Sequence, residues 1–489
     1  MEEYLAHALA RLDALFQSWL IEPISAVIFF DLAFWDDGAP GELELPAVVC
    51  WLIAAAVFFT LRFNFINLRG FRHGVDVVRG RYTGPDAAGE ISPFQALSAA
   101  LAATLGLGNI AGVATAVGIG GPGAVFWMVL AGFLGMSAKF AEVTLAQMYR
   151  ERRADGQFSG GAMHYLRAGL AERGLPRVGA ALAVLFCVMC IGGSLGGGNM
   201  YQANQAFVLL ATVAPPLASI GGALAIGLAL ALLVGLVIVG GIKRIGEVAA
   251  LLVPAMCGLY MLAGFAILAL HASELPAAFA TIVRGAFSPE AAYGGAVGVL
   301  IQGFRRAAFS NEAGCGSAPI AHAAATTSEP VRQGMVALLE PFMDTVVVCN
   351  MTGLVVVVTG AYLDTSAGNG IAMTSHAFAS VLPGFEYVLS LSVLLFAYAT
   401  MISWSYYGEQ CWTHLFGARS LLAYRVLFLL FTAAGPLLAA KAVLEFGDLM
   451  ILGMAFPNLV GVVLLSGKIK RALDDYLARL RAGEFARVA

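Results

Sequence analysis

Charged residues are scarce in this 489-residue chain: Asp, Glu, Lys and Arg together make up 12% of it, whereas 60% of the residues are hydrophobic. Soluble domains carry about 25% charged residues, so this composition excludes a water-soluble enzyme and a disordered chain. The formal net charge is −3 and no long basic tract is present, which excludes a nucleic acid as partner. With a mean hydropathy of +0.82, the chain is expected to be a polytopic membrane protein.

Cysteine is sparse and metal-ligand motifs are lacking. The seven cysteines lie mostly inside apolar runs, and the pair Cys187 and Cys190 has no ligand partner nearby, so neither a disulfide scaffold nor a zinc site is supported. The seven histidines are scattered without metal-ligand spacing. No short apolar core follows the acidic start Met-Glu-Glu, so no secretory signal is evident. A membrane-embedded enzyme would need a catalytic dyad or a metal cluster, and the sequence displays neither.

Long apolar segments are what the chain has in abundance. A membrane-crossing helix needs about 20 mostly apolar residues, and eleven segments qualify: 46–63, 93–117, 123–148, 178–212, 218–240, 246–270, 290–325, 336–360, 383–414, 420–441 and 446–466. Residues 3–20 instead combine leucines at helical spacing with charged residues, which predicts a helix lying on the membrane surface within an interfacial segment, 1–45. A tail, 467–489, follows the last span.

The loops between these spans differ sharply in charge. One alternate set of loops, together with the tail, holds 22 of the 28 lysines and arginines, and the opposite set holds three. Because basic loops stay in the cytoplasm, the N-terminus is expected outside and the C-terminus inside. The predicted location is a bacterial-type inner (plasma) membrane, with membrane lipid around the spans.

The ten spans after the first divide into two blocks of five, 93–270 and 290–466, whose matching spans start 197 to 213 residues apart. Since five is odd, the second block enters the membrane from the opposite face, which makes the blocks an inverted repeat, a build typical of secondary transporters. Span 46–63 is then one extra N-terminal helix. The sequence thus predicts an all-α membrane protein of about 11 transmembrane helices with a 5+5 inverted repeat.

The first spans of both blocks are interrupted. Gly106 and Gly108 interrupt the first, and the segment 300–316 of the other loses apolar character at a similar depth. Glycine loosens a helix, and freed backbone groups inside a membrane are tolerated only where protein or a water-filled cavity satisfies them. Paired breaks therefore predict a central site lined by backbone. A channel would instead show a continuous polar lining.

The two breaks offer complementary backbone groups. N–H groups of Leu105–Gly108 suit a carboxylate, and carbonyls of Leu300–Gly303 suit Na⁺ or an ammonium group. A zwitterionic amino acid needs both kinds of partner, close together. Close packing of helices at small residues is the alternative explanation for the glycines.

Two hydroxyls on a later span favour a cation site. Thr400 and Ser403 are three residues apart and share one helical face. Beside the carbonyls of Ala102 and Leu105 they would form a neutral, all-oxygen Na⁺ site. The alternative is that each hydroxyl bonds the backbone of its own helix.

Few charges lie inside the spans. Lys139 and Glu142 are three apart and can pair with each other, and Arg306 is expected to pair with Glu312 or Glu142 as an inner gate or a structural pair. Whether these residues form an inner gate or a structural pair, we expect these charges on the cytoplasmic side of the membrane.

Three runs of residues resemble the signature segments of the alanine or glycine:cation symporter family (sodium:alanine symporters). They are FQALSAALAATLGLGNIAGVATAVGIGGPGAVFWM (94–128), FRRAAFSNEAGCGSAPIAHA (304–323) and TMISWSYYGEQ (400–410). The resemblance implies the LeuT-type 5+5 inverted repeat of the amino acid–polyamine–organocation superfamily. It also implies uptake of a small neutral amino acid, alanine or glycine, by Na⁺ symport, with no covalent cofactor; the alternative is an H⁺-coupled carrier of another small amino acid or related solute.

The matching motifs also imply the binding residues. The substrate would contact Thr104, Gly106, Gly108, Asn109, Gln202, Gln302, Gly303, Phe304 and Trp404. The Na⁺ site would again use Ala102, Leu105, Thr400 and Ser403. Two positions depart from the family pattern, because members often carry a small polar residue at Leu107 and a glycine at Ala307. These departures leave the preferred amino acid open, and the oligomeric state is not implied.

Overall fold

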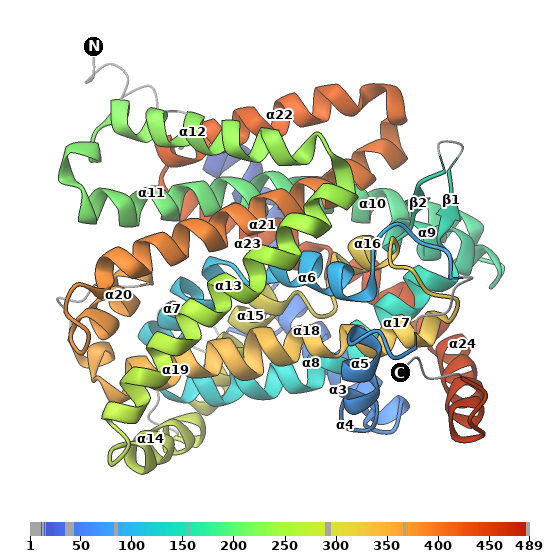
Figure 1. Cartoon of the computed structure of the whole chain (residues 1–489), viewed down its shortest axis with the longest axis horizontal. Coiled ribbons are helices and arrows are strands. Elements are labelled where there is room, and N and C mark those ends of the chain that lie inside the picture. Colours follow the sequence, from blue (N-terminus) through green and yellow to red (C-terminus); the bar gives the residue numbers. More distant parts are fainter. Residues whose placement is uncertain are drawn as a thin grey trace.

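The protein is a bundle of helices, described by a computed structural model for residues 11, 14, 16–34, 44–82, 87–153, 156–288, 295–364, 368 and 370–485 (Figure 1). Much of the predicted surface helix over residues 3–20 lies outside the described residues. Its last turn forms η1 (Gln17–Ile21), which leads into α2 (Glu22–Ile28). The extra N-terminal helix is α3 (Ala47–Arg62).

The first predicted block forms five helical units. Their elements are α6 (Pro93–Thr104), η2 (Leu107–Asn109) and α7 (Ala111–Gly120); α8 (Gly123–Met148); α10 (Pro176–Leu195), η4 (Gly196–Met200) and α11 (Tyr201–Val213); α12 (Ile220–Ile238); and α13 (Gly241–Leu270). A capping box begins α6, since the Ser92 hydroxyl accepts from Gln95 N and the Gln95 side chain accepts from Ser92 N. Short connectors are η5 (Pro215–Leu217) and α14 (Leu275–Phe287).

The second block repeats this pattern. Its elements are α15 (Gly295–Asn311) and α16 (Ala318–His322); α17 (Pro330–Ala337), α18 (Leu339–Pro341), η6 (Phe342–Cys349) and α19 (Asn350–Val358); α21 (Phe385–Phe416); α22 (Leu421–Ala434); and α23 (Ala440–Gly453) and α24 (Ala455–Arg481). Connectors are η7 (Ala361–Leu363), α20 (Ile371–Ala379), η9 (Ala418–Ser420) and η10 (Gly435–Leu437).

Many of these helices are long and apolar enough to cross a membrane. Within the described ranges eight helices qualify, or nine if the bent pair formed by α6 and η2–α7 counts as one span. With 16 and 17 residues, α3 and α15 are shorter. Each of the eleven predicted spans contains a helix, while the number eleven itself stays a prediction.

The bundle has a lipid-facing flank and a packed centre. In α12, Leu228, Leu232 and Leu236 follow one another at helical spacing and are 54–67% exposed. An apolar stripe of this kind is expected against lipid. At the centre of the view, α6 and α15 lie between α21 above and α8 and α19 below, and α13 crosses the bundle diagonally (Figure 1). The interrupted helices therefore lie where the bundle is most enclosed.

One end of the bundle collects the basic loops, and we call it the basic end. It holds α4 (Ile66–Arg69), α5 (Phe71–Val78), the antiparallel pair β1 (Glu151–Arg152) and β2 (Phe158–Ser159), α9 (Ala162–His164) and η3 (Tyr165–Gly169). The Arg150 guanidinium ties three loops together by donating at 2.7–3.0 Å to the carbonyls of Ala88, Ala323, Ala325 and Thr327. Burial lowers the pKa of Arg150.

Candidate functional site

The first break lies between α6 and η2, where the chain bends by 59°. Helix α6 ends at Thr104, and Gly106 adopts an extended conformation. The freed Gly106 N–H donates to Asn109 Oδ1 at 3.0 Å, and Leu107 N–H donates to Gln202 Oε1 of α11 at 3.4 Å. Side-chain amides thus replace the missing helical acceptors, as membrane burial demands. The prediction of a break at these glycines is confirmed.

Glycine is needed at this break because neighbours approach closely. A Cβ on Gly106 would lie 2.7 Å from Thr400 Oγ1 and 3.3 Å from Gln202 Oε1. A Cβ on Gly108 would lie 3.3 Å from Ser310 Cα of α15. Gly106 therefore faces α21 and α11, and Gly108 faces the second interrupted helix.

The second break lies at the C-terminal end of the predicted segment 300–316. Helix α15 is continuous through Leu300–Gly303, so the prediction that these carbonyls are free is wrong. The interruption spans 312–317, where Glu312, Gly314 and Gly316 have φ of 53°, 95° and 84°. Gly303 instead allows close packing on α8, since a Cβ there would lie 2.6 Å from Trp127 Cβ. Polarity alone did not distinguish a packed glycine from an unwound one.

Gln302 and Phe304, the residues on either side of Gly303, also pack against neighbouring helices. Phe304 lies among residues of α3 and α8, including Leu52 and Ala131. A Cβ on Gly120 of α7 would lie 3.5 Å from Gln302 Cβ. No hydrogen bond between described residues links Gln302, Gly303 or Phe304 to the first break.

Two other predicted site residues make their recorded contacts away from the first break. The Thr104 hydroxyl donates to the carbonyls of Ala100 and Leu101 in its own helix. The Trp404 ring, 1% exposed, packs on η4, where a Cβ on Gly198 would lie 2.2 Å from Trp404 Cγ. Neither side chain donates a hydrogen bond to the first break among the described residues.

The junction of α6 and α21 has the composition expected of a cation site. The Thr400 hydroxyl donates to the Ala102 carbonyl at 3.0 Å, while Ser403 Oγ is buried and has no hydrogen-bond partner among the described residues. Leu105 ends α6, so its carbonyl lies at the helix C-terminus, the electronegative end. An orphaned hydroxyl three residues after Thr400, whose own hydroxyl contacts the end of α6, fits a small cation held by oxygen ligands.

Asp344 of η6 connects the two interrupted helices. Asn109 Nδ2 donates to Asp344 Oδ1 at 2.7 Å, and the hydroxyls of Ser310 and Thr345 donate to Oδ2 at 2.9 and 2.6 Å. Asn109 is therefore a bridge between the first break and η6. Sequence analysis missed the roles of Ser310 and Asp344, although a carboxylate inside a predicted span is itself a signal of function.

The charges inside the spans pair differently from the prediction. Arg306 pairs with Asp448 of α23 at 2.9 Å, and Arg305 joins the same carboxylate at 3.2 Å. This cluster precedes the second break, on the side away from the basic end, so Arg306 is not part of an inner gate with Glu312 or Glu142. Lys139 pairs with Glu340 of α18 at 2.9 Å rather than with Glu142. Neither partner is close in sequence, so helical spacing could not reveal it.

Taken with the fold, two interrupted helices meeting at buried polar groups define a secondary transporter of the LeuT type. A solved structure with this fold is MhsT in complex with L-phenylalanine, with a TM-score of 0.53 and 16% identity, covering 77% of this chain and 89% of that one. The model of the sodium:alanine symporter family matches residues 40–488, and the chain belongs to this family. The resemblance of the signature segments is thereby confirmed.

Relatives across this family are similar over nearly their full lengths. Sodium/alanine symporter AgcS of Methanococcus maripaludis is 40% identical over 87% of this chain and 92% of its own. The probable sodium/glutamine symporter GlnT of Bacillus subtilis is 35% identical over 89% of both chains, and the putative sodium/proton-dependent alanine carrier protein YrbD of the same organism is 33% identical over 89% and 90%. The protein is a multi-pass, cation-coupled amino acid transporter and not an enzyme.

Proposed function

We propose that this protein imports a small neutral amino acid, alanine or glycine, by Na⁺ symport. The observation that carries the proposal is the α6–α21 junction, where Thr400 holds the end of α6 and the buried hydroxyl of Ser403 lacks a partner among the described residues. Na⁺ bound there would fix the geometry of the first break, which begins at the next residues. The names of several relatives, which include sodium and alanine, support the same pairing.

The first break supports a small substrate. Even a methyl group on Gly106 would collide with Thr400 Oγ1, so little room remains beside the bare backbone. We assign the substrate-contacting role to the predicted residues around this break, Thr104, Gly106, Gly108, Asn109, Gln202 and Trp404. For Gln302, Gly303 and Phe304, a contact with the substrate is supported by the family resemblance alone.

The proposed cycle couples ion binding to opening. Na⁺ and the amino acid enter from the side away from the basic end, past the Arg306–Asp448 pair, and leave at the basic end, which the excess of basic residues assigns to the cytoplasm. The predicted ligands Ala102, Leu105, Thr400 and Ser403 carry no fixed charge. Each Na⁺ therefore adds one positive charge to the loaded carrier, worth about 2.3 kcal/mol per 100 mV of membrane potential.

Reconstitution tests the proposal. Purified protein in liposomes should accumulate labelled alanine or glycine when an inward Na⁺ gradient is imposed, and faster when the interior is made negative. Unlabelled glutamine and phenylalanine should compete poorly. Uptake that needs a proton gradient and ignores Na⁺ would replace this proposal with the H⁺-coupled alternative.

A further inference from the structure

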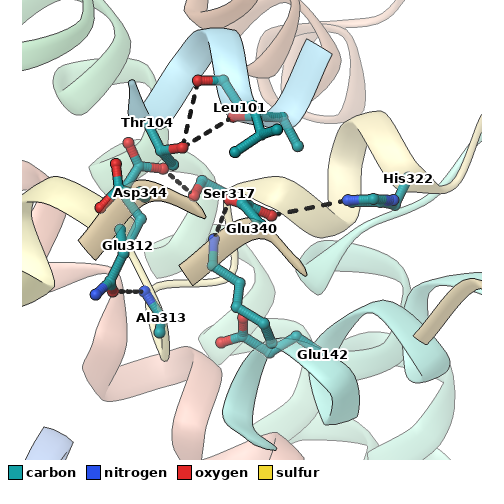
Figure 2. Close-up of polar contacts among 12 residues, drawn as sticks. Leu101, Thr104, Glu142, Glu312, Ala313, Ser317, His322, Glu340 and Asp344 are labelled. Atoms are coloured by element: carbon teal, nitrogen blue, oxygen red, sulfur yellow. Dashed lines mark hydrogen bonds and ion pairs between the residues drawn. The ribbon is translucent and has the colours of Figure 1, made fainter. Parts of the chain in front are cut away.

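A second group of buried charges lies between the breaks and the basic end. It contains Glu142 of α8, Glu312 at the second break, Glu340 of α18 and Asp344 of η6, none of them more than 2% exposed (Figure 2). Lys139 is the only lysine or arginine among the described residues that forms an ion pair with any of them. Four buried carboxylates with one ammonium leave an excess of negative charge that a membrane protein interior does not tolerate unaided.

The four carboxylates differ in what compensates them. Glu340 has Lys139 at 2.9 Å, and Asp344 accepts three hydrogen bonds. Glu142 Oε1 accepts from the Asn458 amide at 2.5 Å, the Gly314 backbone also contacts this carboxylate, and Glu142 Oε2 has no geometric hydrogen-bond partner in the part of the chain that the structure describes. Glu312 accepts from the Ser317 hydroxyl. Glu142 and Glu312 are thus the two that have neither an ion-pair partner nor a full set of hydrogen bonds.

His322 lies beside this cluster and adds a buried polar atom without a hydrogen-bond partner. Its Nδ1 lies 2.8 Å from Gln333 Nε2. Its Nε2 is fully buried, has no hydrogen-bond partner among the described residues and lies 3.7 Å from Glu340 Oε2, which is likewise unpartnered (Figure 2). The polar atoms of this cluster are therefore incompletely satisfied as they stand.

A metal ion does not fit this cluster as well as a proton. Within the described ranges, no three His, Cys, Asp or Glu side chains are placed to hold one metal ion. A proton needs only one carboxylate oxygen. The titratable or charged groups that face Glu142 or Glu312 from the packed elements are Lys139, Tyr165, Cys315, Glu340, Asp344 and Tyr407. His322 faces Glu340.

The position of Glu312 connects this cluster to motion. Glu312 has a left-handed backbone at the start of the 312–317 link, a conformation that disfavours non-glycine residues. Asn458, which contacts Glu142, also donates to the Gly314 carbonyl in that link at 2.8 Å. A movement of α16 relative to α15 would therefore separate the acids from their present neighbours and admit water from the basic end.

We propose that Glu142 and Glu312 form a proton-binding site that loads in the closed state and releases its proton at the basic end when the second break opens. A hydronium ion transfers its proton to a carboxylate oxygen and leaves as water; on release the O–H bond breaks and the proton passes back to water, with no redox change. Transport would then depend on a proton as well as on Na⁺. The proposal rests on the proposed function for its coupling to uptake, but proton binding itself can be measured separately.

The transport test uses proteoliposomes with an inward Na⁺ gradient and an interior held at about pH 6 or about pH 8. An acidic interior should slow wild-type alanine uptake by up to about tenfold per pH unit, because the opened carrier must release its proton into the interior before the cycle can continue. Glu312→Gln and Glu142→Gln should lose this dependence and keep their need for Na⁺. Glu172→Gln, which removes an exposed carboxylate paired with Lys468 at the basic end, should behave as wild type.

A spectroscopic titration separates the two proposals. Infrared difference spectra of the purified protein, taken without substrate, should contain a carboxylic acid carbonyl band that disappears on alkalinisation and is reduced in either glutamine variant. The band without uptake of any amino acid would overturn the proposed function and leave the proton site. Na⁺-driven uptake with equal pH dependence in all variants, or no variant-sensitive band, would overturn the proton site. If Glu312→Gln fails to fold, the Glu142→Gln variant and the wild-type band decide whether the proton site exists.

Discussion

Ser403→Ala tests the Na⁺ site because the hydroxyl that it removes is buried and lacks a hydrogen-bond partner among the described residues. A buried polar group in that condition costs about 1–3 kcal/mol of desolvation. Removing it from the ion-free protein should leave the melting temperature in Na⁺-free buffer unchanged or higher. A hydroxyl with a purely structural hydrogen bond would give the opposite result.

The same oxygen acquires a partner when Na⁺ binds. Polar contacts to a charged group are worth about 1.5–3 kcal/mol, and each 1.4 kcal/mol changes an affinity about tenfold. Ser403→Ala should therefore raise the Na⁺ concentration for half-maximal uptake by about 10- to 150-fold, with little change in the maximal rate at saturating Na⁺. The stabilisation that Na⁺ confers on the purified protein should shrink by the same free energy.

Ser405→Ala is the matched control. Ser405 lies on the same helix and is also buried, but its hydroxyl donates to the Ile402 carbonyl at 2.7 Å within α21. Na⁺-dependent uptake in proteoliposomes and melting temperatures with and without Na⁺ provide the two readouts. An unchanged Na⁺ requirement in Ser403→Ala, combined with a lower melting temperature in Na⁺-free buffer, would remove this residue from the cation site.

Three further predictions concern the break, the buried ion pair and the basic end. A side chain at Gly106 should abolish alanine uptake without loss of expression, because its Cβ would lie 2.7 Å from Thr400 Oγ1. The control Gly112→Ala, with nothing within 4 Å of the added carbon, should transport normally. Equal uptake by both variants would show that the break does not face the substrate. Lys139→Met should lower the free energy of unfolding by about 3–5 kcal/mol, because Glu340 loses its ion-pair partner. In a thermal-shift assay, adding Glu340→Gln should restore much of that loss. An undiminished melting temperature in the single variant would contradict this pairing. Burial, aided by neighbouring basic side chains, lowers the pKa of His164 to about 4. Because the unfolded chain then takes up the proton first, the free energy of unfolding should fall by about 3 kcal/mol as the pH drops from about 6.5 to about 4. His164→Gln should reduce the fall of the melting temperature over this pH range, and an unaltered fall would refute the assignment.

The first break and its ion-site candidates could be predicted because their signals are local. Gly106 and Gly108 are two residues apart in an apolar run, and Thr400 and Ser403 share a helical face. The structure agrees with the break and brings Thr400 to the Ala102 carbonyl. Short-range spacing is enough where one helix supplies the feature, since backbone geometry fixes the positions of residues three or four apart.

The second break and the charge pairs could not be predicted in the same way. A glycine gives the same signal whether it frees the backbone, as at Gly314, or admits a neighbouring helix, as at Gly303. Likewise, Arg306 lies six residues from Glu312 in sequence but pairs with Asp448, which is 142 residues away. Partners of this kind depend on how the two repeats pack together, and hydrophobic periodicity carries no information about that packing.

The contacts of Asp344 explain how ion, substrate and proton could influence one another across the two breaks. Asn109 accepts from Gly106 N–H at the first break and donates to Asp344, which in turn accepts from Ser310 just before the second. A ligand that fixes Gly106 therefore also restricts Ser310 and the link that carries Glu312. Coupling between binding sites is reciprocal, so a proton that stabilises the closed second break must raise the affinity of the first break for whatever ligand favours the same state.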